Sequence, residues 1–214
     1  MTDNALDLLR LTQWLSPAFP LGSFAYSHGL ESFISAGEIG DAATFETWLV
    51  AILERGAGWN DGLLLSLTHR QAENDGHLAA LAAALASSRE RWEESLSQGS
   101  AFARTTNALL ETDLPPLALP VAVGIQARQL RLETATVIAL YLQSSASNLV
   151  SVATRAVPLG QTEAQAVLER MSPKIVKLAE HLATADAEAF AAATPRADWR
   201  AMVHETAEPR LFRS

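Results

Sequence analysis

One long stretch without charge, Thr134 to Thr154, dominates the hydrophobic pattern of the chain. It contains no Asp, Glu, Lys, Arg or His, and Glu133 and Arg155 enclose it. Its first half is apolar on every side, which is typical of a helix surrounded by protein. Small polar residues from Gln143 to Asn148 interrupt the continuous apolar run of about 20 residues that a membrane span requires. We therefore predict a buried central helix of a soluble bundle over about 133–155.

Helical periodicity also governs most of the remaining sequence. Apolar residues recur at three- and four-residue spacing, Ala is abundant, and the alternation typical of strands is almost absent. This predicts an all-α, single-domain helical bundle of about ten helices around the central one. Capping residues and breakers place the other helix starts near Asp3, Ser23, Asp41, Asn60 or Asp61, His77, Ser87, Pro120, Thr162 and Ala185.

The connections between these helices give further expectations. The helix capped by Ser23 should run to Gly37, where glycine ends it. The segment 16–22 contains two prolines and a glycine, so it should be irregular, and Phe19 and Leu21 should pack it onto the core. One helix should expose the charged residues of its first turns to solvent: Arg89, Glu90, Arg91, Glu93 and Glu94.

The end of the chain differs from the rest in composition. Residues 1–195 are expected to form the helical domain, and residues 196–214 a tail that adds little core. Leu211 and Phe212, flanked by Arg210 and Arg213, are unfavourable in water and well suited to a partner's groove. We expect the tail to be disordered alone and to order on binding a partner, although a frayed end is the simpler interpretation.

Composition and charge restrict the function. The 214 residues carry a net charge of −8, which disfavours nucleic acid and anionic membranes as partners. The sequence has no cysteine, so disulfides, thiolate metal sites and cysteine nucleophiles are excluded. The first residues lack the basic start and apolar run of an export signal, which indicates a cytoplasmic protein.

Candidate chemistry is sparse. The sequence contains no nucleotide-binding P-loop, no G-x-S-x-G nucleophile elbow and no H-E-x-x-H motif. His28 and Glu31 are three residues apart on an expected helix, a spacing that two metal ligands could use. The simpler interpretation is that neighbouring groups satisfy both side chains, and that Tyr26, Ser27 and His28 tie the preceding loop to the bundle. We expect no catalytic residue and no stably bound metal or cofactor.

Arg155 and Gln161 allow two interpretations. A cation directly after a buried helix can cap the free carbonyls at the helix C-terminus. A fixed guanidinium beside a rigid turn can instead belong to a partner surface, where Arg is enriched. Gln161 could serve either purpose, and the residues alone do not decide between them.

Three segments together resemble the UreF family, the urease accessory proteins. The first matches the family's opening signature and contains Pro20, Gly22, Ser23, Phe24, Tyr26, Ser27, His28 and Glu31. The second places Arg155 before the turn Pro158, Leu159, Gly160 and Gln161. The third is the terminal segment with His204, Glu205, Arg210, Leu211, Phe212, Arg213 and Ser214. The sequence departs from the family pattern near Pro120, where Leu119 and Val123-Gly124 stand in place of other family residues.

This resemblance implies a protein that is not an enzyme and that assists Ni²⁺ insertion into apo-urease. It implies a homodimer that binds the accessory protein UreD, called UreH in some systems, and recruits the GTPase UreG. Ni²⁺ would pass through the complex without stable binding. Residues 204–214 would engage the UreD-type partner, while 155–161 and 23–31 would shape or adjoin the partner surfaces. The alternative is an all-helical small-molecule or metal-binding enzyme with a site in the bundle core around His28 and Glu31.

Overall fold

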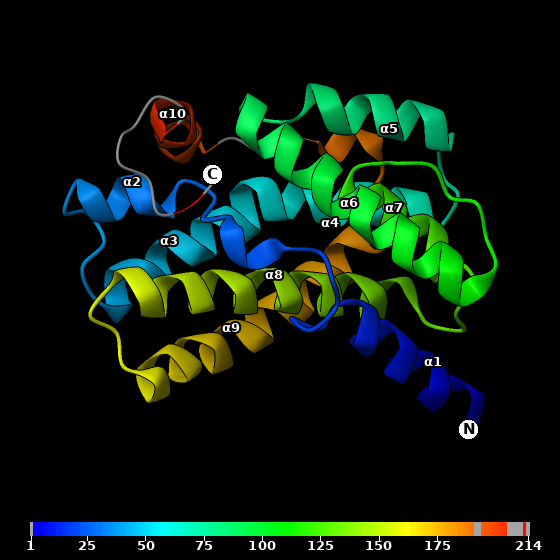
Figure 1. Cartoon of the computed structure of the whole chain (residues 1–214), viewed down its shortest axis with the longest axis horizontal. Helices are drawn as coiled ribbons and strands as arrows, with labels where there is room; N and C mark the ends of the chain where they lie inside the picture. Colours follow the sequence, from blue (N-terminus) through cyan, green and yellow to red (C-terminus); the bar gives the residue numbers. More distant parts are fainter. Residues whose placement is uncertain (1, 191–193, 205–211, 213–214) are drawn as a thin grey trace.

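The computed structural model describes residues 2–190, 194–204 and 212, and helices are the regular elements of this part (Figure 1). No strand occurs among these residues, so the all-α prediction is confirmed. The elements in chain order are α1 (Thr2–Trp14), η1 (Ser23–Ala25), α2 (Leu30–Ser35), α3 (Ala42–Arg55), α4 (Ala57–His69), α5 (Asp75–Ala84), α6 (Arg89–Leu110), α7 (Leu119–Ala127), α8 (Thr134–Ala156), α9 (Gln161–Leu182), η2 (Ala187–Ala189) and α10 (Pro195–His204).

The predicted central helix is α8. It packs along α9 and also contacts α4, α3, α2 and α1, so helices surround much of it (Figure 1). Its length and composition would also suit a membrane span, a property that the core helices of soluble proteins share. Val137, Ile138 and Leu142 are fully buried in the core. The apolar face of α8 therefore packs against protein.

Small polar residues of α8 bind the loop that precedes α2. The Ser144 hydroxyl donates to the carbonyl of Leu15 at 2.6 Å, and the Asn148 amide donates to the carbonyl of Ser23 at 3.0 Å. Phe19 is buried, with its ring centre 5.9 Å from that of Phe102. The expectation that the irregular segment 16–22 packs onto the core is thereby confirmed.

The prediction of one helix from Ser23 to Gly37 is wrong. The chain forms the short η1, then a turn, and only then the six-residue α2. Gly22, His28 and Gly29 have positive φ angles of 73°, 53° and 77°, which a right-handed helix excludes. His28 therefore precedes α2, and it does not share a helix with Glu31.

The predictions for the starts of α3 and α4 have different outcomes. Asp41 caps α3 as predicted, because its carboxylate accepts from the Thr44 N–H at 2.8 Å. The start predicted at Asn60 or Asp61 is wrong, since α4 already begins at Ala57. Asp61 thus lies inside a helix, and its side chain is available for contacts with other elements.

The described part of the C-terminal region packs onto the protein more than the sequence predicted. In place of a helix over 185–193 the structure has the short η2, and residues 191–193 lie outside the described part. The helix α10 forms the beginning of the expected tail and packs on α2 and α6. Ala197 and Phe212 belong to the hydrophobic core, so this region contributes more packing than expected.

Candidate functional site

Phe212 is buried in its own subunit. Only 7% of this residue is exposed, and its backbone N–H donates to Glu31 Oε2 at 3.0 Å. The guanidinium of Arg155 lies over the ring, 4.9 Å from its centre. This corrects the expectation that the ring is left free for a partner's groove. An aromatic ring buries a large apolar area, which favours packing against the body of the protein over exposure.

Most other residues assigned to the tail lie outside the described part of the chain. Glu205, Arg210, Leu211, Arg213 and Ser214 belong to this group, as does the side chain of His204. Their assignment to a partner therefore stays a prediction.

Arg155 joins the end of α8 to the loop before α2. Its Nε donates to the Ser151 carbonyl at 3.2 Å, and its Nη2 donates to the Phe24 carbonyl at 2.8 Å. The first bond stays within the last turns of α8, and the second reaches another element. Gln161 is exposed at the start of α9, after a turn in which Leu159 is buried and Pro158 and Gly160 are exposed. The described contacts of Arg155 are with Ser151, Phe24 and Phe212, and Gln161 is not among them.

After η1, the first of the three family-like segments enters the core at Tyr26 and Ser27. Tyr26 is 8% exposed and Ser27 is fully buried, so both side chains belong to the packed interior. His28 and Glu31 contact different groups, since His28 reaches Glu94 whereas Glu31 accepts from Phe212. The structure therefore does not bring His28 and Glu31 together as a pair of ligands.

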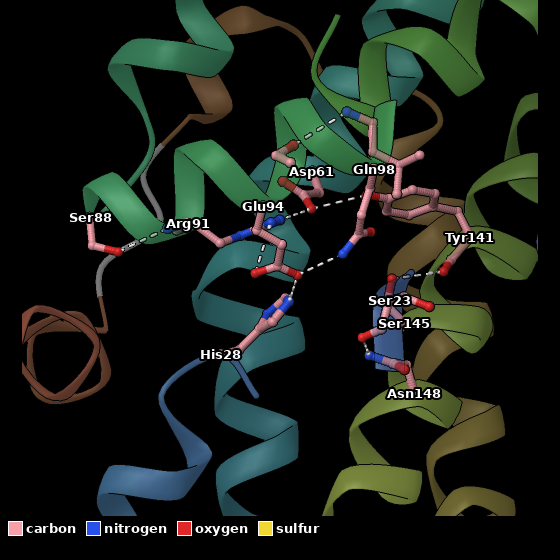
Figure 2. Close-up of polar contacts among 12 residues, drawn as sticks. Ser23, His28, Asp61, Ser88, Arg91, Glu94, Gln98, Tyr141, Ser145 and Asn148 are labelled. Carbon is pink, nitrogen blue, oxygen red and sulfur yellow. Dashed lines mark hydrogen bonds and ion pairs between the residues drawn. The ribbon is translucent and has the colours of Figure 1, made fainter. Parts of the chain in front are cut away.

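A set of charged and polar side chains, each buried or half-buried, lies between α4, α6 and α8, and Figure 2 shows its contacts. We call it the buried polar cluster; it comprises His28, Asp61, Arg91, Glu94, Gln98 and Tyr141. The ring Nε2 of His28 lies 2.8 Å from Glu94 Oε1, and Gln98 donates to the same oxygen at 3.0 Å.

The guanidinium of Arg91 lies at the centre of this cluster. Its Nη2 donates to Asp61 Oδ2 at 2.5 Å, and its Nη1 lies 3.7 Å from Glu94 Oε2. The hydroxyl of Tyr141 donates to the same Asp61 oxygen at 3.0 Å. Charged side chains from α4 and α6 thus compensate each other inside the protein, which is the condition for burying them.

Burial and charge determine the protonation of the cluster. Burial alone would lower the pKa of Arg91, but Asp61 and Glu94 outweigh it and raise that pKa. Burial raises the pKa of Tyr141 well above its usual value, and the neighbouring charge of Asp61 adds to this effect. The tyrosine therefore stays neutral and keeps its proton on the bond to Asp61.

The expectation that Arg91 and Glu94 face solvent is wrong. Glu94 is 1% exposed, and the Arg91 side chain is 13% exposed. One signal could have placed them correctly. The buried Phe102 belongs to the apolar stripe of α6. Steps of four, four and three residues back from it reach Gln98, Glu94 and Arg91, which therefore lie on the same stripe.

Cavities adjoin the buried polar cluster. A cavity of about 310 Å³ is lined in part by Asn60, Asp61, Arg91 and Asp198. A smaller one, of about 50 Å³, lies against His28, Asp61, Arg91, Glu94 and Tyr141. Among the residues that the structure describes, no group of three or more His, Asp or Glu side chains has the arrangement of a metal site. The cavities therefore have polar walls without a preformed metal cage.

An apolar face of α10 is exposed. Trp199, Met202 and Val203 are 64%, 48% and 38% exposed, and Met202 and Val203 lie three and four residues after Trp199. Such a row of residues forms one side of a helix, and the opposite side of α10 packs on α2 and α6. An exposed apolar stripe on a docked helix is typical of a protein interface. The sequence did not reveal this surface, because residues 196–214 were expected to form a tail.

Comparisons with known proteins agree on one family. The family model UreF matches residues 39–172. The chain is 51% identical over 207 residues to the urease accessory protein UreF of Cereibacter sphaeroides, covering 97% of this chain and 98% of that protein. The protein of the same name from Dinoroseobacter shibae is 49% identical, with 96% and 98% of the two chains covered. The one from Rhodopseudomonas palustris is 42% identical, with 98% and 94% covered.

Proposed function

Because this chain belongs to the UreF family of urease accessory proteins, we propose that it binds a UreD-type (UreH-type) accessory protein and recruits a UreG-type GTPase. The resulting complex inserts Ni²⁺ into apo-urease in the cytoplasm. In this proposal the chain acts as a homodimer and is not an enzyme. It contributes surfaces for the partners, and the GTPase supplies the chemistry of GTP hydrolysis.

The observation that carries this proposal is the exposed apolar face of α10. Trp199, Met202 and Val203 present large side chains to solvent from a helix whose other side is fixed to the protein. Because the backbone of α10 is already ordered on the protein, a partner that covers these side chains does not have to order the helix as well. Aromatic residues such as Trp199 also supply much of the binding energy in typical interfaces.

The contacts of Phe212 suggest how the region after α10 takes part. Arg155 and Glu31 hold this residue against the body. In our proposal the partner meets α10 together with the terminal residues His204, Glu205, Arg210, Leu211, Arg213 and Ser214. Phe212 then fixes the position of the partner-binding segment, and its ring does not enter the partner itself. In this proposal Arg155 contributes to docking through Phe212, and Gln161 is assigned to the same partner surface.

Nickel is cargo in this proposal, and the chain does not hold it stably. The cavities beside the buried polar cluster have polar walls that include Asp61 and Glu94. Carboxylate oxygens favour a passing divalent cation, and a tight cage would retain it. The rival hypothesis is a small-molecule or metal-binding enzyme around His28 and Glu31. It requires stoichiometric binding of a metal or ligand to the isolated chain, which equilibrium dialysis with Ni²⁺ would detect.

The test is co-purification with UreD-type and UreG-type proteins, with and without GTP and Ni²⁺. Three changes are compared: the double variant Trp199→Ala/Met202→Ala, removal of residues 208–214, and Val176→Ala. Val176 is 49% exposed on α9, so its substitution is a matched control for loss of an exposed apolar side chain. We expect the first two changes to abolish capture of the UreD-type protein and activation of urease, while Val176→Ala keeps both.

Stability is the necessary control, because a misfolded protein also fails to bind. The double variant should keep the melting temperature, since its side chains are exposed. The truncation should lower it measurably, because it removes Phe212 from the core, so its binding is measured well below its melting temperature. Full urease activation by both altered proteins would disprove the docking role of this region.

A further inference from the structure

The turn between η1 and α2 has an unfavourable backbone conformation. His28 has a φ of 53°, and the next residue, Gly29, has a φ of 77°. Glycine adopts such angles readily, but a residue with a Cβ does so at a cost in energy. The Leu30 N–H donates to the Ser27 carbonyl at 3.0 Å and closes the turn, and contacts of the His28 side chain can add to this support.

The same turn determines where α10 lies. A Cβ on Gly29 would be 3.3 Å from the backbone nitrogen of Ala201 and 3.4 Å from its Cα, so the two backbones are in close contact. On the same side of α10, Ala197 is 9% exposed. A shift of the turn at Gly29 would consequently displace α10.

The described ion pairs of α10 are made with Glu38, and not with the turn at Gly29. Arg196 and Arg200 both pair with Glu38, which follows α2. Arg196 is largely exposed, and solvent and salt weaken such pairs. These ion pairs favour the docking of α10 but do not fix the turn at Gly29.

One contact fixes the side chain of His28. Its Nε2 lies 2.8 Å from Glu94 Oε1, whereas its Nδ1 is buried and has no hydrogen-bond partner within the described part of the chain. Glu94 is itself held by Gln98 at 3.0 Å and lies beside Arg91. The ring is therefore anchored to a rigid, buried group on α6.

A small cavity marks the place where these elements meet. Its volume is about 30 Å³, and its lining includes His28, Gly29, Arg91, Ala197 and Ala201. The turn, the start of α6 and α10 thus share one packing site.

We propose that His28 and Glu94 are positioning residues for partner docking: their contact holds the left-handed turn at 28–29 in the conformation on which α10 packs, and so sets the position of its exposed apolar face. This inference rests on the proposed function, because it assumes that α10 binds the UreD-type partner. It gives His28 a role that involves neither a metal nor catalysis.

Two substitutions at the same position separate the side-chain contact from the backbone conformation. In His28→Gln the amide nitrogen can reach the place of Nε2 and keep the bond to Glu94. In His28→Asn the shorter amide cannot reach Glu94, although Asn tolerates the left-handed conformation better than most residues. The pair His77→Gln and His77→Asn on exposed His77 provides the matched control.

Hydrogen exchange of the full-length chain, measured by mass spectrometry, tests the effect on α10. We expect His28→Asn to accelerate exchange in peptides covering 195–204 by about tenfold, because it removes a bond to a buried charged group. His28→Gln should restore most of the protection. Peptides from α8 and α9, and both His77 variants, should exchange as in the unaltered protein. Unchanged exchange of α10 in His28→Asn would overturn the proposal.

Affinity for the purified UreD-type protein supplies the second readout. We expect His28→Asn to weaken binding by about tenfold and His28→Gln to recover it, a rescue that general destabilisation would not produce. If Trp199→Ala weakens binding but His28→Asn does not, the positioning role is overturned while the proposed function stands. If Trp199→Ala also leaves binding unchanged, α10 is not the docking surface and the role of His28 fails with it. If the unaltered chain does not bind the UreD-type protein, the proposed function itself fails.

Discussion

The guanidinium carbon of Arg155 lies 4.9 Å from the centre of the Phe212 ring. The same guanidinium donates to the carbonyl of Phe24 at 2.8 Å, so it connects α8, the loop before α2 and the C-terminal segment. Glu31 completes this arrangement by accepting from the Phe212 N–H. The three segments that carry the family resemblance thus meet at Arg155.

Arg155→Ala should loosen the C-terminal segment without unfolding the domain. A cation over an aromatic ring at an exposed site contributes about 0.5–1 kcal/mol, which corresponds to about two- to fivefold faster hydrogen exchange around Phe212. Arg155→Lys should have an intermediate effect, since it keeps the charge but cannot make the same set of contacts. Arg170→Ala, which breaks an exposed pair with Glu46, should leave this region unchanged. Equal exchange in all these proteins would contradict the role of Arg155.

Asp61→Ala should strongly destabilise the protein. It leaves the buried guanidinium of Arg91 with Glu94 as its remaining carboxylate in the buried polar cluster, at 3.7 Å. Removing one partner of a buried ion pair costs about 3–5 kcal/mol. Tyr141→Phe should cost about 1 kcal/mol, because Asp61 keeps its bond to Arg91. Urea unfolding of the two variants tests this order, and a larger loss for Tyr141→Phe would contradict it.

The stability of the protein should fall when His69 becomes protonated. This residue lies at the end of α4, with Nδ1 2.9 Å from the Thr134 hydroxyl, and burial lowers its pKa below 6.5. Folding therefore favours the neutral ring. The contribution of His69 is fully present above pH 6.5 and is lost as the pH falls through the lowered pKa.

Unfolding measurements between about pH 7.5 and about pH 5.5 test this sign. The free energy of unfolding should decrease over this range, and His69→Asn should remove part of the decrease. His77→Asn, at an exposed position on α5, serves as the control and should keep the full pH dependence. An identical slope in His69→Asn and the unaltered protein would show that His69 does not contribute.

Gly99→Ala should disrupt the packing of α6 against the segment before α7. A Cβ at this position would lie 1.9 Å from the carbonyl oxygen of Leu117 and 2.7 Å from the nitrogen of Leu119. Backbone atoms on both sides cannot move away easily, so we expect a loss of about 3 kcal/mol. Gly40→Ala, where a Cβ would meet nothing within 4 Å, is the control. Similar melting temperatures for the two variants would contradict this account.

The sequence by itself determined the helices whose signals are local. The uncharged stretch over 134–154 became α8 (Thr134–Ala156), and Asp41 caps α3 as expected. Helical periodicity and capping depend on residues a few positions apart, so the sequence contains all the information they need. The three signature segments likewise indicate the family through their residues alone, because each is a continuous run of characteristic composition.

Only the tertiary structure decided which charged residues are buried and where the C-terminal segment lies. Arg91 looked like a surface residue, but Asp61, 30 residues earlier, comes from another helix to neutralise it. His28 adopts a left-handed conformation because Glu94 of α6 holds its ring, and Phe212 is buried because Arg155 and Glu31 come together beside it. The free energy of burying a charge or a ring depends on groups distant in sequence, so local patterns could not predict these positions.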